Sequence, residues 1–99
     1  MYMTIRQYPI QWGSLDEILR LAREGFYPAM RAYPGFISYQ VMDPGDGTVV
    51  AVSLFATRDA ASDANVRATE WVRENLGAHI SGPPRIIWGP VRVDVPNGE

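Results

Sequence analysis

The order in which strand-like and helix-like segments alternate constrains this sequence more than any other feature. Apolar residues recur at helical spacing in two segments, which begin at Ser14 and at Thr57. Segments rich in β-forming residues lie at residues 3–10, 36–42, 48–56 and 85–95. The predicted order is therefore β-α-β-β-α-β. The 99 residues are expected to form a single domain, because this length is close to the common size of one.

Capping and helix-breaking residues predict the bounds of the first helix. Ser14 and Glu17 fit a capping box, in which the serine accepts from first-turn amides and the glutamate reaches back to the cap. Pro28 should kink the helix or end its regular part near Gly25, because proline lacks the N–H that a helix needs. The helix is expected to be over by residues 34–35.

Turn and cap residues also predict the bounds of the later elements. Residues 43–47 form a dense turn signal, so the second and third strands should make a hairpin. Asp59 is the expected N-cap of the second helix, and Gly77 suits its C-terminal cap. The last strand is interrupted by Gly89 and Pro90, and a proline inside a strand indicates an edge, a bulge or a crossing point.

This element order predicts a fold of the α+β class, the ferredoxin-like arrangement, with two helices on one face of a four-stranded antiparallel sheet. The opposite face would then lack cover. Residues 49–56 are apolar on both faces apart from Ser53, and a monomer tolerates only a few hundred Å² of exposed apolar surface. Two copies packed sheet against sheet would cover it, so a homodimer is expected, with the last strand able to reach its partner at residues 89–90.

The composition argues against several classes of function. The net charge is −2 and the nine basic residues, all arginine, do not cluster, which gives no reason to expect nucleic acid or an anionic membrane. The chain has no cysteine and one histidine, so disulfides, thiolate metal sites and multi-histidine metal sites are excluded. We expect a cytoplasmic protein, because no signal-peptide pattern and no membrane-spanning apolar run is present.

Two polar residues stand out as candidates for chemistry. Asn65 lies within about 20° of Leu76 on the helical wheel, so it belongs to the apolar face of the second helix. A buried amide needs a partner, which is either a ligand in a pocket or a neighbouring backbone group. His79 follows this helix and is the only side chain that ordinarily titrates near neutral pH. It is a candidate general base for a phenol or quinol, a haem ligand, or an exposed loop residue.

Four larger side chains are candidates for contact with a ligand. Trp71 sits at the margin of the same helix face, where tryptophan most often packs in a core or anchors a dimer. Tyr8, Tyr39 and Arg85 lie on strands. Alternation along a strand does not reveal which of its faces turns toward the helices, so the register between strands decides their role.

Residues 33–42 and 50–60, which read Tyr-Pro-Gly-Phe-Ile-Ser-Tyr-Gln-Val-Met and Val-Ala-Val-Ser-Leu-Phe-Ala-Thr-Arg-Asp-Ala, resemble the antibiotic biosynthesis monooxygenase (ABM) family of the dimeric α/β barrel superfamily. Residues 65–76 resemble uncharacterised bacterial members of it. The resemblance implies a dimer with a pocket between sheet and helices, and a role for Trp71 in lining that pocket. Family members include cofactor-free oxygenases of quinol-like aromatics, haem-degrading enzymes and proteins with no known activity.

The leading hypothesis is a cofactor-independent monooxygenase that acts on a small aromatic or quinol-like compound. His79 and Asn65 are its expected catalytic residues, Trp71, Tyr8, Tyr39 and Arg85 would contact the substrate, and no cofactor or metal is expected. The alternative is a non-catalytic dimeric module that binds a small apolar ligand. Haem binding is a third hypothesis, weakened because haem-degrading members carry an asparagine on the first strand, where this chain has Gln7 and Tyr8.

Overall fold

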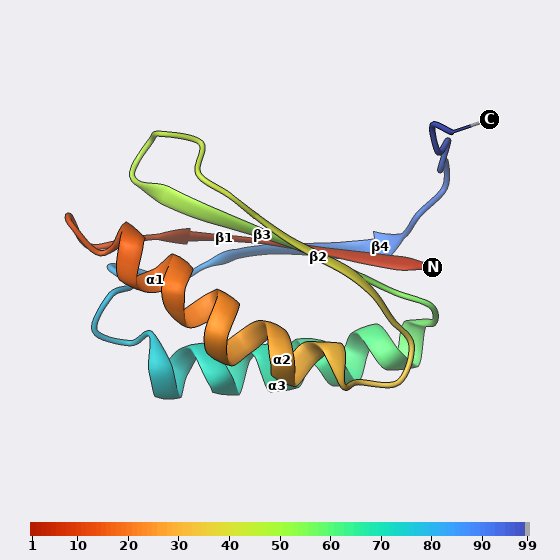
Figure 1. Ribbon diagram of the computed structural model, residues 1–99, viewed down its shortest axis with the longest axis horizontal. Coiled ribbons are helices and arrows are strands. Elements are labelled where there is room, and N and C mark those ends of the chain that lie inside the picture. Colours follow the sequence, from red (N-terminus) through yellow and green to blue (C-terminus); the bar gives the residue numbers. More distant parts are fainter. Residues whose placement is uncertain (99) are drawn as a thin grey trace.

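The computed structural model describes residues 1–98 and contains the predicted elements in the predicted order. The elements are β1 (Tyr2–Pro9), α1 (Leu15–Leu21), η1 (Ala22–Phe26), α2 (Tyr27–Arg31), β2 (Phe36–Met42), β3 (Thr48–Phe55), α3 (Arg58–Asn75) and β4 (Arg85–Pro90). Because α1, η1 and α2 follow one another without a break, they form the first helical unit of a β-α-β-β-α-β chain (Figure 1).

The four strands form one antiparallel sheet in the order β2-β3-β1-β4. Both helical units cover the same face of this sheet (Figure 1), which confirms the predicted ferredoxin-like arrangement. β4 is an edge strand that ends at Pro90, so the expectation that it continues to Val95 is wrong. The physical reason is that Pro90 pairs with Tyr2, the first residue of β1, and beyond it β1 offers no partner.

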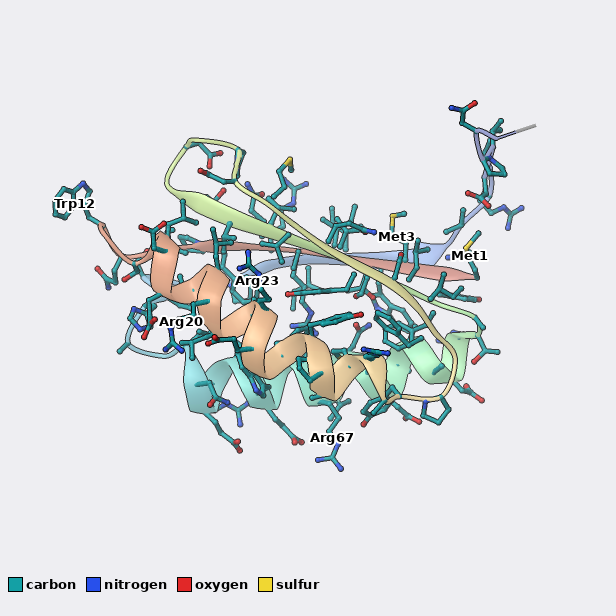
Figure 2. All side chains as sticks on the ribbon, viewed as in Figure 1. Met1, Met3, Trp12, Arg20, Arg23 and Arg67 are labelled. Carbon is teal, nitrogen blue, oxygen red and sulfur yellow. The ribbon has the colours of Figure 1, made fainter. Side chains whose placement is uncertain are left out.

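The central strand β1 turns its polar face toward the helices. Residues paired across antiparallel strands point to the same side of a sheet, so the register gives β1 one face with Thr4, Arg6 and Tyr8 and another with Met3 and Ile5. Thr4, Arg6 and Tyr8 are buried, and Thr4 is only 1% exposed. Met3 stands on the sheet face away from the helices (Figure 2). The polar face of β1 is therefore the inner one.

The inner face packs against the helices in two adjoining clusters of buried side chains. The first cluster consists of Phe26, Met30, Phe55, Ala61, Ala64 and Ala68. The second consists of Tyr8, Ile18, Val49 and Leu76. Trp71 packs against both clusters, and its ring meets Phe26 edge-on with centroids 5.2 Å apart. The alanines of α3 let this helix lie close to β1 and β3, which are the strands it contacts most.

The first helix does not begin with the expected capping box. Ser14 is the N-cap residue, but its backbone is helical and its side chain makes no capping hydrogen bond. Its Oγ lies 2.9 Å from Nδ1 of His79 instead. Glu17 does not reach back to the cap either, because both of its carboxylate oxygens accept hydrogen bonds from Arg20.

Pro28 changes the geometry of the helix before it, as expected, but the helix does not end there. Proline has no N–H and its ring crowds the carbonyl four residues earlier, here that of Glu24. The backbone widens into the π-helical turn η1 just ahead of Pro28 and then continues as α2. Gly25, within this turn, lies so close to Trp71 that a Cβ atom there would be 3.0 Å from Cζ2 of the indole.

The cap of the second helix also differs from the one expected. Thr57 is the N-cap of α3, and its Oγ1 accepts a hydrogen bond from the Ala60 amide at 3.1 Å. Asp59 lies inside the first turn. Thr57 takes this role because its backbone is extended, as an N-cap requires. Leu76 closes the helix, and Gly77 does not adopt the left-handed conformation of a capping glycine.

The sheet face opposite the helices carries apolar side chains that no helix covers. By the register this outer face includes Met3, Ile5, Val52, Leu54 and Ile87, and Ile87 is 52% exposed. The segment after β4 rises on the same side (Figure 1), and a hollow of about 360 Å³ lies between it, β1 and β4.

Trp12 is a second exposed apolar group, at the far tip of the loop after β1, away from the rest of the chain (Figure 2). Among the described residues, none of the helices has the length and hydropathy needed to cross a bilayer.

Replacing Thr57 should test which residue caps α3. We expect Thr57→Ala to lower the free energy of unfolding by about 1 kcal/mol, because the Ala60 amide loses its partner. Asp59→Asn should cost less, since it removes only a charge near the positive end of the helix dipole. Guanidinium denaturation of both variants measures the difference. A loss for Asp59→Asn that equals or exceeds that for Thr57→Ala would contradict this cap assignment.

Candidate functional site

Arg6 is the polar centre of the space between sheet and helices. It projects from the middle of β1 and is only 6% exposed. Nη1 donates to the Tyr8 hydroxyl at 3.1 Å, and Nη2 donates to the backbone carbonyl of Asn65 at 2.8 Å. Both nitrogens also lie 3.3 Å from the hydroxyl oxygen of Thr69. The guanidinium thus links the central strand to α3 through neutral acceptors alone.

No carboxylate neutralises this guanidinium within residues 1–98. The ion pairs found there join Arg20 to two glutamates of its own helical unit, and Arg67 to Glu70. In the same residues Nε of Arg6 donates no hydrogen bond, and the buried side-chain atom that lacks a partner is Thr4 Oγ1. Nε therefore has no hydrogen-bond partner among these residues and is not completely enclosed by them. Burying a cation without an opposite charge is costly, so its retention calls for an explanation.

Aromatic side chains surround Arg6 on the helix side of the sheet. We call the space between them the inner pocket, and its lining includes Tyr8, Phe26, Tyr39 and Trp71. Phe26 lies between two of these rings, with its centroid 5.1 Å from Tyr39 and 5.2 Å from Trp71. The cavity itself is about 40 Å³, which has room for water but not for an aromatic ring.

Two larger hollows lie outside the inner pocket, along the seam between α3 and β4. The Gly77 hollow measures about 440 Å³ and is lined by β1, α3, β4 and the loop after α3. The Trp88 hollow measures about 450 Å³ and lies farther along the same seam. Four residues line both, namely Arg6, Thr69, Arg73 and Ile86. Arg6 and Tyr8 also line the inner pocket, so the Gly77 hollow and the inner pocket share a wall.

Four of the six site residues expected from the sequence lie at these spaces. Tyr8, Tyr39 and Trp71 line the inner pocket. Asn65 lines the Trp88 hollow, where its backbone carbonyl holds Arg6. Asn65 is half-buried, which differs from the buried amide expected on the apolar helix face, and no hydrogen bond from its side-chain amide to another described residue is found.

The other two expected residues, His79 and Arg85, line neither the inner pocket nor the two hollows at the seam. The imidazole of His79 is hydrogen-bonded to Ser14 where the loop after α3 is pinned to the end of β1. Arg85 pairs with Gln7, a residue of the outer face, so its side chain belongs to the sheet face away from the helices. Within residues 1–98 no three histidine, aspartate or glutamate side chains gather to hold a metal ion.

The sequence pattern showed Arg6 but did not identify it as a site residue. Along β1 the residues Thr4, Arg6 and Tyr8 alternate with Met3 and Ile5. Such alternation ordinarily places the apolar set in the core and the polar set in water. In this sheet the apolar side chains of β1 lie on the outer face, away from the helices. The sequence signal for this arrangement is that the neighbouring strand is apolar on both faces, and this signal could have pointed to an inward-facing arginine.

Burial raises the pKa of the Tyr39 phenol, and nearby Tyr8 acts in the same direction while the charge of Arg6 opposes it. The folded protein therefore keeps this proton at a pH at which the unfolded chain has lost it. The free energy of unfolding should fall as the pH rises above the ordinary tyrosine value of about 10. We expect Tyr39→Phe to lose less stability than the wild type over this range, measured by denaturation at several pH values. Equal losses would contradict the assignment.

No known family model and no curated protein sequence matches this chain. Solved structures with the same fold do exist. A monooxygenase from the ActVA-Orf6 gene of Streptomyces coelicolor, in complex with nanaomycin D, is 23% identical with a TM-score of 0.77, covering 98% of this chain and 92% of its own. SnoaB from Streptomyces nogalater, described as a cofactor-independent oxygenase and solved as a point mutant, is 15% identical with a TM-score of 0.74, covering 97% of each chain.

A third structure, a point mutant of MhuD with two manganese protoporphyrin IX molecules bound per active site, is 15% identical with a TM-score of 0.76. The alignment covers 98% of this chain and all of MhuD (100%). Identities this low establish a shared fold and nothing about a shared reaction. Two solved structures that carry the name antibiotic biosynthesis monooxygenase share the same fold with TM-scores of 0.76 and 0.74, at 17% and 20% identity, so the fold implied by the sequence resemblance is confirmed.

Proposed function

We propose that this protein is a cofactor-independent monooxygenase that acts on a small aromatic, quinol-like compound bound on the helix side of the sheet. The observation that carries the proposal is the lining of the inner pocket, where Tyr8, Phe26, Tyr39 and Trp71 surround a buried guanidinium. Aromatic walls with a few placed polar groups are typical of pockets for flat organic molecules. Two oxygenases share this fold, so the reaction class is proposed by analogy of fold and rests on the pocket for its physical support.

The chemistry needs an electron-rich substrate that reacts with oxygen directly. Loss of the phenolic proton makes the quinol an anion that can transfer electrons to O2. An anthrone forms the corresponding anion by losing one proton of its ring CH2 group to solvent. This carbon then bonds to one atom of O2 and becomes a carbonyl as its second hydrogen leaves. The other oxygen atom leaves as water, which takes up that hydrogen and one proton from solvent.

The size of the inner pocket requires that a substrate enlarge it. The cavity of about 40 Å³ shares Val72 and Ile80 with the Gly77 hollow of about 440 Å³. Movement of these two side chains would join the two spaces into one that falls in the usual range for small-molecule sites. We propose that the substrate enters from the Gly77 hollow and places its ring near Trp71.

A non-catalytic ligand-binding module is the second candidate, and the position of His79 favours it. The imidazole is bonded to Ser14 and does not line the inner pocket, which leaves this pocket without a side chain that ordinarily titrates near neutral pH. His79 lines neither the inner pocket nor the two hollows at the seam, and this position argues against its ligating a haem bound in any of these spaces.

We further propose that two copies pack through the outer sheet face. Met3, Ile5 and Ile87 on this face have no cover within one chain, and the segment after β4 rises beside them with Val93 exposed. A symmetric contact buries the same patch on both copies at once. This arrangement leaves the inner pocket and the seam on the opposite side free for a ligand.

Oxygen uptake with a panel of hydroquinones and anthrones tests the enzymatic proposal. We expect uptake by the wild type, and a rate at least about tenfold lower for Trp71→Phe and Tyr8→Phe, equivalent to about 1.4 kcal/mol of lost transition-state stabilisation. Tyr33→Phe, a matched change away from the inner pocket, should keep the wild-type rate.

The same assay decides the roles of the two expected catalytic residues. Unchanged rates in Asn65→Ala and His79→Gln would remove both from the mechanism. The absence of uptake with every compound, together with binding of the same compounds, would overturn the oxygenase proposal in favour of the binding module.

A charge placed on the outer sheet face tests the dimer. We expect the wild type to elute as a dimer in size-exclusion chromatography with light scattering, and Ile87→Asp to elute as a monomer, because the contact would bury two like charges. Val66→Asp, at a similarly exposed position on α3, should remain dimeric. A monomeric wild type, or a dimeric Ile87→Asp variant, would exclude this interface.

A further inference from the structure

We infer that Arg6 is an anion-binding residue and that the Gly77 hollow takes an aromatic compound carrying an anionic oxygen, either a carboxylate or a phenolate. This inference deepens the proposed function by naming the charge of the ligand and the residue that holds it. Binding of such an anion does not depend on any oxygenation step, so the two can fail separately.

The hydrogen bonds of Arg6 do not explain why a positively charged side chain is buried at this position. Its acceptors are the Tyr8 hydroxyl, the Thr69 hydroxyl and the Asn65 carbonyl, all of them neutral. The Asn65 carbonyl already accepts a hydrogen bond from Thr69 at 3.1 Å, so it would keep a partner without Arg6. A neutral donor would suffice for the structural links. The positive charge itself has no partner among the described side chains, and an anionic ligand would provide one.

The lining of the Gly77 hollow is cationic and contains no acid. Arg6 lies at its base on β1, and Arg73 lines it from α3. No aspartate or glutamate is among the residues that line it, whereas the neighbouring Trp88 hollow includes Glu70. Two arginine residues line one space that has no carboxylate among its lining residues, and this favours an anion there. Guanidinium groups also match the planar geometry of a carboxylate.

The remaining walls suit an aromatic ring. Val72, Ile80, Pro84 and Ile86 give the hollow apolar sides, and its volume of about 440 Å³ is enough for a bicyclic compound. Arg6 also lines the inner pocket, so an oxyanion held by it could direct the attached ring either along the hollow or past Val72 toward Trp71. Its unpaired Nε–H is a donor available to such an oxyanion.

Isothermal titration calorimetry with charged and neutral pairs of ligands tests this inference on the intact protein. The carboxylate arm compares 1-naphthoate with 1-naphthamide, and the phenolate arm compares ionised 4-nitrophenol with 4-nitroanisole. We expect at least one anion to bind about tenfold or more tightly than its neutral partner, the size that one charge-assisted hydrogen bond supplies. The arm that shows the preference identifies the kind of oxyanion.

Variants assign the preference to a residue. Arg6→Met should remove it and remain folded, because replacing a buried charge by an apolar group of similar volume is often tolerated. Arg6→Lys should keep part of it, and Arg73→Met should reduce it several-fold. Arg23→Met, an exposed arginine on η1, is the matched control and should leave it unchanged. Circular dichroism confirms that each variant is folded.

Equal affinity for anion and neutral partner in both arms, or binding of neither anion, overturns the inference with the wild type alone. Retention of the full preference in Arg6→Met also overturns it. Oxygen uptake with a neutral substrate, together with no anion preference, would support the oxygenase proposal and exclude the anion-binding role of Arg6. An anion preference without oxygen uptake would support the role of Arg6 and exclude the oxygenase proposal.

Discussion

The pairing of β1 with both of its neighbours is the constraint on which the rest of this molecule depends. β1 lies between β3 and β4, and its register with them sets which side chains of three strands turn toward the helices. A slip of one residue would exchange the two faces of β1 and bring Met3 and Ile5 under α3 in place of Arg6. The aromatic lining, the buried guanidinium and the apolar outer face are all consequences of one set of backbone hydrogen bonds.

The sequence was sufficient for the fold and for part of the lining of the inner pocket. The predicted bounds of β2 match those found, and turn chemistry placed the hairpin correctly because its signals are local. The end of β4 could not be predicted, since it depends on where β1 runs out of partners. The capping box at Ser14 and the N-cap of α3, which is Thr57, were misassigned because backbone conformation, not residue type, decides whether a side chain can cap.

The site shows the same division between local and non-local information. Trp71 was a candidate lining residue through the family resemblance and Tyr8 through its place on the first strand, and both line the inner pocket. Arg85 falls on the other sheet face, which only the register could reveal. Arg6 was not predicted as a site residue because a polar residue on an alternating strand usually faces water. A central strand with its polar side inward breaks the usual pattern of sheet burial, and such breaks are expected at functional or strained sites.

The close approach of Gly25 to the indole of Trp71 has a consequence for how the binding space could change during evolution. Gly25 does not line the inner pocket, yet a single methyl group there would meet the ring at 3.0 Å and force it to shift. The shape of the pocket thus depends on a residue that does not line it. Descendants of this chain could change the inner pocket through one codon change in η1, with every lining side chain unaltered in identity.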